Sequence, residues 1–457
     1  MVKFDLNTLN TNLMKFKILA SLLLLVYFSL NVKSQSSFKK EKEDSLMSLL
    51  AEKDKAMGSI AVMDNGKIVF ARAIGYREVS PGKVPSDTET KYRIGSITKM
   101  FTSAMLFQLI EEGRLQLSQT LDKFFPEVPN AGKITIGNMM NHRSGIHNFT
   151  NDPQYRVYMT QRKTRDEMLG IITAMKPDFE SGEKYQYSNS NYVLLGYIVE
   201  DLRKMPYSEA LQKYICKKAG LTQTYVGSKA SITNNESYSF MYTGGWDRQP
   251  ETDMSIPQGA GAIVSTPSDL VRFISALFDG KLVKPASLDQ MKTITDGMGF
   301  GIQKFPYENK TVYGHGGGID GFSSILVYIP EDRLAVAYCS NGTVYPVNDI
   351  LLRTLNNYYG KQERLPEFKV YSADPATFDK YTGVYSSPGV PIKLTISKNG
   401  DRLFGQGEGQ PPFPLEPSAK DEFKFEVAGI VIKFMPEKNQ FTLNQGGSEN
   451  LFTREKP

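Results

Sequence analysis

The chain alternates between stretches with strand-like and helix-like spacing of apolar residues. Residues 40–56 are charged and carry three leucines on one face, which predicts an amphipathic helix. The string SIAVMDNGKIVFARAIGY, residues 59–76, has two apolar runs on either side of Asn65-Gly66, a strong signal for a hairpin turn. A sheet is therefore expected to begin here.

Strand-like runs return late in the chain, after a mostly helical and irregular stretch from about residue 100 to 300. They read KTVYGHGG, FSSILVYIP and RLAVAYCSN, and residues 344–360 follow as a predicted helix. The simplest arrangement pairs the early hairpin with these strands in one antiparallel sheet, with the middle of the chain as a helical region covering one side. The predicted fold class is α+β, an antiparallel sheet flanked by helices.

The last part of the chain has a different pattern of apolar residues and turns. From residue 366 onwards, short strand-like runs are broken by Asn399-Gly400, QPPFP and PEKN. Several short strands at close spacing predict a small all-β sandwich or barrel. Because 457 residues are too many for one ordinary core, we expect two domains, residues 35–362 and 366–457.

The N-terminus has the pattern of a targeting segment. Two lysines precede the apolar run ILASLLLLVYFSL, residues 18–30, and Ser34 follows it. This order predicts a secretory signal peptide over residues 1–34, cleaved before Gln35. The alternative is an uncleaved anchor, but the run is shorter than the roughly 20 apolar residues that a membrane span needs. We expect a secreted or periplasmic protein with no stable membrane span after cleavage.

Charge and cysteine content narrow the classes of function. The 54 lysines and arginines exceed the 49 acidic residues by only five, without basic blocks, so no nucleic-acid partner is indicated. The chain has two cysteines, Cys216 and Cys339, and three histidines, with no metal-ligand spacing among them, so we expect no cofactor. Export permits a disulfide, yet Cys339 lies in an apolar strand-like run, and we favour two free thiols.

The pattern Ser-x-x-Lys occurs five times, and only the copy at Ser96 precedes a long helical pattern, which ends near Gly113. Residues three apart share a helix face, so Lys99 can bring its amine to the Ser96 hydroxyl. The positive helix end favours a developing alkoxide, and burial lowers the pKa of a lysine towards that of a general base. The alternative is a helix cap followed by a solvated lysine.

A second motif, Tyr187-Ser188-Asn189, precedes a new apolar helix that begins near Asn191. A tyrosine there can accept or relay the serine proton, and an asparagine can hold a substrate carbonyl. The same Tyr-x-Asn pattern recurs in FPYENKT, residues 305–311, but that string is typical of a hairpin tip.

A third motif lies in YGHGGGIDGF, where His315-Gly316-Gly317 ends one strand before another begins. Glycines allow a substrate backbone to approach a sheet edge, and the N–H of Gly318 can pair with that of Ser96 as an oxyanion hole. Taken alone, the string also fits an ordinary glycine turn.

Together the three motifs, in this order, resemble those of the serine β-lactamase and penicillin-binding superfamily, in particular the branch of class C β-lactamases, DD-peptidases and esterases. The strings NHRSGI and GAGAIVSTPSDLVRF are also similar to it, and the resemblance spans roughly residues 40–360. It implies a β-lactamase/transpeptidase-like fold. The C-terminal part resembles small β-barrel domains fused to such hydrolases, which implies no function.

The resemblance also implies roles for individual residues. Ser96 would form the acyl-enzyme, while Lys99 and Tyr187 would handle protons. The residues implied for substrate binding, along the strand edge and beside it, are Asn189, His315, Gly317 and Gly318.

One departure from the family pattern bears on the substrate. Where β-lactamases usually carry Lys-Thr/Ser-Gly, this chain has His315-Gly316-Gly317, without a fixed cation or hydroxyl to bind a carboxylate. We therefore expect a serine hydrolase acting on a small ester, amide or peptide, peptidoglycan-derived peptides included. The alternatives are a D-Ala-D-Ala carboxypeptidase or D-aminopeptidase, a β-lactamase, and a catalytically silent penicillin-binding module that senses the cell wall.

Overall fold

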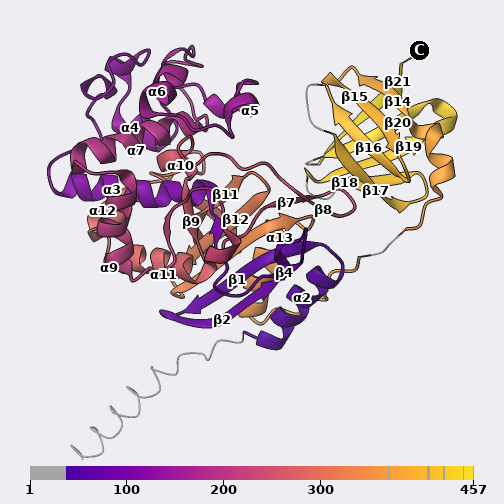
Figure 1. The fold of residues 1–457 in the computed structure, drawn as a ribbon, viewed down its shortest axis with the longest axis horizontal. Coiled ribbons are helices and arrows are strands. Elements are labelled where there is room, and N and C mark those ends of the chain that lie inside the picture. The colour runs from indigo at the N-terminus through magenta and orange to yellow at the C-terminus, as the bar shows by residue number, and fades with distance from the viewer. Residues whose placement is uncertain (1–37, 369–370, 409–411, 426–427, 446, 456–457) are drawn as a thin grey trace, which may run out of the picture.

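The structure, a computed structural model, shows a mixed domain of sheet and helices beside a β-barrel (Figure 1). The residues that it describes are 38–368, 371–408, 412–425, 428–445 and 447–455. The predicted signal peptide, residues 1–34, lies outside this range. No helix within the described residues is long and apolar enough to cross a membrane.

The main sheet has six antiparallel strands in the order β10-β11-β12-β13-β1-β2. Their bounds are β1 Ala56–Asp64, β2 Lys67–Ile74, β10 Gln303–Tyr307, β11 Lys310–Ile319, β12 Phe322–Ile329 and β13 Leu334–Thr343. Strand β1 pairs with β13, with Ile60 opposite Tyr338, so the first and last strands of this domain lie side by side (Figure 1). The predicted pairing of the early hairpin with the late strands is confirmed.

Two turns match the sequence signals. Asn65 and Gly66, between β1 and β2, have φ of 49° and 79°, the positive values that a two-residue hairpin turn requires. Glu308, between β10 and β11, has φ of 51°, so FPYENKT is a hairpin tip as predicted.

Both faces of the sheet are covered. On β13, Val336 and Tyr338 pack against α2 (Lys40–Glu52) and α13 (Val347–Tyr358). The alternate residues, among them Cys339, face α11 (Pro267–Phe278). A strand buried on both faces is a continuous apolar run, which explains LAVAYC. Cys339 and Cys216 are both buried free thiols.

The helical region joins β5 to β10 and carries several short strands. Its helices are α3 Thr98–Glu111, α4 Ile136–Met140, α5 Tyr155–Tyr158, α6 Arg165–Thr173, α7 Asn189–Arg203, α8 Tyr207–Leu211, α9 Lys217–Ala219, α10 Gln258–Gly261, α11 and α12 Pro285–Met291. The short strands here and in the β2–β5 segment are β3 Tyr76–Glu78, β4 Val84–Pro85, β5 Tyr92–Arg93, β6 Tyr225–Val226, β7 Phe240–Tyr242, β8 Trp246–Arg248 and β9 Ile263–Ser265.

Helix α3 is the central helix of this region. Its apolar spacing predicted one buried face, but every residue from Thr98 to Leu109 is buried, polar side chains included. The reason is that α7 and α10 pack against it as well, so even Lys99 is removed from solvent.

The C-terminal part is a closed barrel, which decides between the predicted sandwich and barrel. Its strands are β14 Gly383–Ser387, β15 Val390–Asn399, β16 Arg402–Gly407, β17 Phe413–Ala419, β18 Glu422–Phe425, β19 Ile430–Met435, β20 Gln440–Gln445 and β21 Ser448–Arg454. Tyr385, Phe423, Phe434 and Phe441 fill its interior. We retain the domain limits 35–362 and 366–457 as a proposal.

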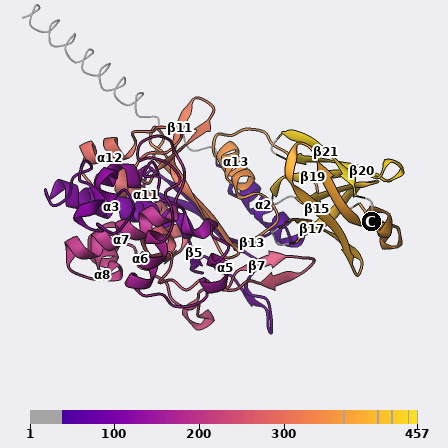
Figure 2. The same cartoon turned by 90° about the horizontal axis from the view of Figure 1, so that it is seen from above.

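The barrel contacts the main domain through its β16–β18 side. Lys55 Nζ lies 3.2 Å from Glu416 Oε2 on β17, and Arg402 on β16 donates to the backbone carbonyl of Thr243, in the β7–β8 turn. Both cartoon views show β7 next to the barrel (Figures 1 and 2).

Candidate active site

Ser96 lies on a short 3-10 turn, Gly95–Ile97, that leads from β5 into α3. Gly95 has φ of 52°, and a Cβ there would lie 2.7 Å from the backbone nitrogen of Gly318. Only a glycine allows this close approach between the turn and β11. No side chain caps the start of α3, so the interpretation of Ser96 as a helix cap is excluded.

Lys99 is buried beside Ser96. Its Nζ lies 3.0 Å from Ser96 Oγ, 2.8 Å from Asn189 Oδ1 and 2.9 Å from the carbonyl oxygen of Ala260. Burial lowers the pKa of Lys99 well below its ordinary value. A neutral amine has two N–H donors for the two carbonyl oxygens, and its lone pair is then directed at the serine hydroxyl.

Tyr187, from the second motif, also contacts Ser96. Its hydroxyl donates to Ser96 Oγ over 2.8 Å. Burial raises the pKa of Tyr187, so the phenol stays protonated at neutral pH. Ser96 Oγ therefore contacts an amine with a lowered pKa and a phenol with a raised one.

Asn189 begins α7 and contacts both sides of the site. Its Oδ1 accepts from Lys99, its Nδ2 donates to Thr150 Oγ1 over 3.2 Å, and its backbone N–H donates to Asn148 Oδ1. An amide nitrogen has two N–H bonds, so one remains for a substrate carbonyl.

His142 was missed by the sequence reasoning as a site residue. Its ring stacks on that of Tyr187, with centroids 4.2 Å apart, and its Nδ1 accepts from the backbone N–H of Ser188. Burial, together with the nearby Lys99, holds the pKa of His142 well below its usual range, so the ring is neutral. The only signal was its place in the string NHRSGI, which cannot reveal what the ring contacts.

His315 lies behind the strand edge. It is only 2% exposed, and its Nδ1 donates to the carbonyl oxygen of Gly316 over 2.5 Å. Burial, with a smaller effect of Lys99, lowers the pKa of His315 to about 3. A neutral buried imidazole supplies no fixed cation to a substrate, in line with the departure from the Lys-Thr/Ser-Gly pattern.

The two predicted glycines differ in their surroundings. A Cβ on Gly317 would lie 2.0 Å from the carbonyl oxygen of Ile94, so this position packs against the segment that precedes Ser96. Gly318 lies beside Gly95 and faces the open cleft.

The cleft in front of Ser96 has a volume of about 540 Å³. Of the predicted residues, its lining includes Ser96, Asn189 and Gly318, and not His315 or Gly317. Helix α5 contributes the exposed cation Arg156 to the same lining.

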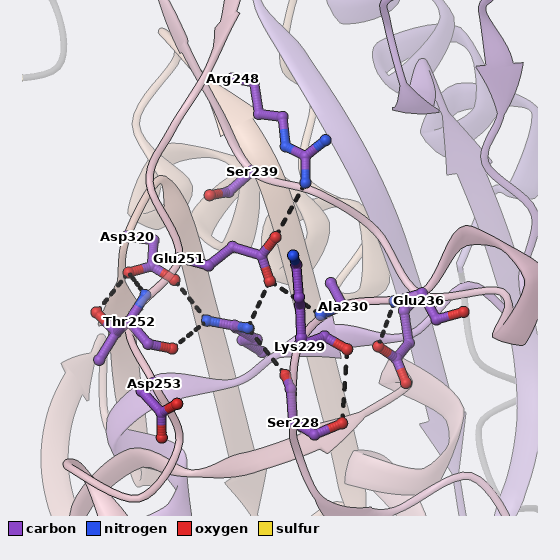
Figure 3. Close-up of polar contacts among 12 residues, drawn as sticks. Ser228, Lys229, Ala230, Glu236, Ser239, Arg248, Glu251, Thr252, Asp253 and Asp320 are labelled. Atoms are coloured by element: carbon purple, nitrogen blue, oxygen red, sulfur yellow. Dashed lines mark hydrogen bonds and ion pairs between the residues drawn. The ribbon is translucent and has the colours of Figure 1, made fainter. Parts of the chain in front are cut away.

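A buried ion-pair network lies at one end of this cleft. Arg93, on β5, is 3% exposed and donates to Asp320 Oδ2 and Glu251 Oε2, over 2.9 and 2.8 Å, and to the carbonyl oxygens of Thr252 and Ser228. Asp320 also accepts from the N–H and hydroxyl of Thr252. Figure 3 shows Asp320, Glu251, Thr252 and Ser228 grouped around the centre of this network.

This network connects the two segments that carry the expected oxyanion donors. Arg93 precedes Ser96 by three residues, and Asp320 follows Gly318 by two. The ion pair therefore holds the β11–β12 turn against β5. Within the described residues, no group of three or more histidine, cysteine or acidic side chains is arranged to hold a metal ion.

The comparisons with known proteins identify the family. The model of the beta-lactamase family matches residues 46–359, more than half of the chain. The chain belongs to the beta-lactamase family. This confirms the resemblance drawn from the three motifs, and the chain is a serine hydrolase of this family.

Two curated relatives differ in their extent. Penicillin-binding protein 4* of Bacillus subtilis is 27% identical over 92% of this chain and 99% of its own length. Teichoic acid D-alanine hydrolase of Staphylococcus aureus is 24% identical over 67% of this chain and 75% of its own length. The first match therefore extends over the barrel as well.

Solved structures share the fold of this family. D-amino acid amidase from Ochrobactrum anthropi is similar with a TM-score of 0.62 and 26% identity, over 70% of this chain and 99% of that chain. An octameric penicillin-binding protein homologue from Pyrococcus abyssi has a TM-score of 0.61 and 24% identity over 90% of this chain, which supports the fold alone.

Proposed function

We propose that the protein hydrolyses an ester or amide bond through an acyl-enzyme on Ser96. The observation that carries this proposal is the pair of contacts to Ser96 Oγ, 3.0 Å from Lys99 Nζ and 2.8 Å from Tyr187 Oη. A buried, neutral amine beside a serine hydroxyl is a general base for nucleophilic attack.

Acylation follows from this geometry. The Ser96 O–H proton moves to Lys99 Nζ while Oγ forms a bond to the substrate carbonyl carbon. The carbonyl oxygen becomes an oxyanion that accepts from the N–H groups of Ser96 and Gly318, at the mouth of the cleft. The tetrahedral intermediate then expels the alcohol or amine, which takes the proton from Lys99 through the Tyr187 hydroxyl.

Deacylation repeats these steps with water. A water molecule loses a proton towards Tyr187 and Lys99 as its oxygen bonds to the acyl carbon. The bond to Ser96 Oγ breaks, and the serine recovers its proton, so that an acid is released and the free enzyme restored. Lys99 is neutral again at the end of the cycle.

The substrate class is proposed from the lining of the cleft and from the relatives. A buried neutral His315 replaces the usual lysine, so a strongly anionic β-lactam meets no cation at this strand position. Two relatives, a teichoic acid D-alanine hydrolase and a D-amino acid amidase, support D-amino-acid esters, amides and short peptides as the first substrates to test. Export through the predicted signal peptide, to the periplasm or the outside, is part of this proposal.

The test is covalent labelling with a fluorophosphonate and turnover of p-nitrophenyl acetate. We expect mass spectrometry to find the label on Ser96, and Ser96→Ala to abolish turnover. Ser188→Ala is the matched control, since Ser188 lies next to Tyr187, is buried, and has a hydroxyl without a partner among the described residues. A label on another residue, or equal rates in wild type and Ser96→Ala, would favour the silent penicillin-binding module.

A further inference from the structure

A second depression lies between the main domain and the barrel, beside the candidate active site. It is lined on one side by β7, the start of β12 and the end of β13, and on the other by β17 and β18. Its volume is about 160 Å³. We call it the interdomain crevice.

The interdomain crevice and the cleft in front of Ser96 share part of their lining. Asp320, Phe322 and Ser323, in and after the β11–β12 turn, line both spaces. Of these, Ser323 pairs with Gly318, which approaches Gly95, the neighbour of Ser96. Adjacent strands lie about 4.8 Å apart, and the close contact of Gly318 with Gly95 adds a second, similar step, so the crevice lies on the order of 10 Å from the nucleophile.

Most of the crevice lining is apolar. Phe240, Met241 and Phe322 contribute from the main domain, and Pro414 and Phe425 from the barrel. Met241 is 42% exposed, unusual for a large apolar side chain. Its exposure leaves apolar surface for a ligand to cover.

The charged groups on the walls already have partners. The pairs are Glu416 with Lys55 at 3.2 Å, Lys424 with Glu422 at 3.8 Å, and Asp320 with Arg93 at 2.9 Å. A charged ligand would therefore lose its hydration without gaining an unpaired opposite charge. An uncharged, apolar group fits this environment.

The size of the crevice limits that group. A cavity of roughly 150 Å³ lined by apolar side chains holds a benzene molecule in another protein. The crevice has about 160 Å³, which is room for one ring or a short alkyl chain.

The barrel is attached at the edge of this crevice. Arg402 donates to the carbonyl of Thr243, and a Cβ on Gly244 would lie 1.0 Å from its guanidinium. Because Gly244, in the β7–β8 turn, has no side chain, the Arg402 guanidinium can occupy this space. This contact fixes β17 and β18 opposite β7, so the barrel wall keeps its place.

We propose that the substrate carries an uncharged apolar group on the order of 10 Å from the scissile carbonyl, and that this group binds in the interdomain crevice. The barrel is then one wall of the substrate site. This rests on the proposed function, because the scissile carbonyl is the one attacked by Ser96. The group belongs either to an acyl or alkyl chain or to an apolar residue of a peptide.

The main experiment compares kcat/KM for p-nitrophenyl acetate and p-nitrophenyl octanoate in the full chain. Met241→Lys puts a charge into the crevice, and Phe425→Ala removes part of the barrel wall. Both should lower the value for octanoate at least about tenfold, the lower range for apolar pocket contacts, and leave acetate unchanged. Leu451→Lys is the matched control, because Leu451 is 47% exposed on β21, across the closed barrel from β17.

A second series distinguishes the two sources of the apolar group. It compares D-alanine p-nitroanilide with D-phenylalanyl-D-alanine p-nitroanilide in the same variants. Selective loss in the ester series indicates a chain, and selective loss in the peptide series indicates an apolar residue. Equal loss on short and long substrates, or no loss in either series, overturns the proposal.

Binding can be followed without turnover, which separates failure of this proposal from failure of the proposed function. Trp246 is the only tryptophan of the chain, and its ring lies 5.0 Å from that of Tyr242, on the crevice wall. Titration with octanamide should change its fluorescence. If the wild type cleaves no substrate, the proposed Ser96 mechanism fails. Octanamide binding that is about tenfold weaker in Met241→Lys and normal in Leu451→Lys would still support the crevice as a binding site. Absence of octanamide binding to the wild type overturns the crevice proposal.

Discussion

The two domains fill their interiors with different chemistry. The main domain buries Lys99, His142 and His315 around Tyr187, and burial lowers the pKa of these three cationic groups. Among the described residues of the barrel, no polar or charged side chain is buried in the core, which consists of aromatic and aliphatic residues.

The difference shows where a protein accepts an energetic cost for chemistry. A buried amine loses hydration that its hydrogen bonds only partly replace, and the same burial lowers its pKa towards the range of the general base proposed for Lys99. The barrel has no such group, and its interior follows ordinary packing. We therefore expect any effect of the barrel on the reaction to come from its outer surface, which lines the interdomain crevice.

The largest effect on catalysis is expected from Lys99→Arg. Arginine keeps a positive charge and does not deprotonate in proteins, so it cannot accept the serine proton. We expect acylation to slow at least about 100-fold, the lower range for general-base catalysis, as measured by stopped flow. The same exchange at Lys123, which is 65% exposed, is the control, and retained activity in Lys99→Arg would remove the lysine from the mechanism.

The pH dependence tests the same group. The folded pKa of Lys99 is lowered, so raising the pH from 5 converts it to the neutral base, and kcat/KM should rise about tenfold per pH unit until that pKa is passed. His315, with a pKa of about 3, is already neutral in this range, and the raised pKa of Tyr187 keeps its phenol protonated. A flat profile between pH 5 and 10 would contradict a titrating lysine base.

A smaller effect is expected from Asp320→Asn, which breaks the ion pair with Arg93 next to the β11–β12 turn. Gly318 would then shift relative to Ser96. Complete removal of an oxyanion donor lowers kcat about 100-fold or more. Because a shift is a smaller change, we expect kcat on p-nitrophenyl acetate to fall about tenfold with little change in KM. Glu251→Gln is the control, since it removes the other carboxylate of Arg93 without touching the turn. Equal effects of the two variants would reduce the network to a structural role.

The smallest catalytic effect is expected in the barrel core. Phe441 is fully buried and stacks on Phe452 at 4.9 Å, so Phe441→Ala should lower the free energy of unfolding by about 3–5 kcal/mol in urea titration. Turnover of p-nitrophenyl acetate should stay within about twofold. Phe101 is equally buried and lies two residues from Lys99, so Phe101→Ala should lower both the free energy of unfolding and the turnover. Equal loss of turnover in Phe441→Ala and Phe101→Ala would contradict the separation of the barrel core from the chemistry.

Much of the fold was predictable because it follows local rules. The turn at Asn65-Gly66, the alternation in the late strands and the hairpin tip near Glu308 depend on residues adjacent in the chain. The contact of Ser96 with Lys99 is local as well, since residues three apart share a face.

Other parts of the site were not predictable from spacing. His142 lies 45 residues before Tyr187 along the chain, and Arg93 lies 227 before Asp320, as the sequence numbers show. Nothing in their local strings indicates stacking or an ion pair. His315 was expected along the substrate strand edge, but burial turned its ring towards the carbonyl of Gly316.

The sequence by itself determined the strands, the turns and the order of the three motifs, because backbone preferences and apolar periodicity act over a few residues. The tertiary structure alone decided which side chains lost their water. Lys99 is a candidate base because α7 and α10 cover α3, and the interdomain crevice exists because the barrel sits opposite β7. Burial and the position of one domain against another depend on the packing of distant segments, and packing is what shifts a pKa or builds a binding wall.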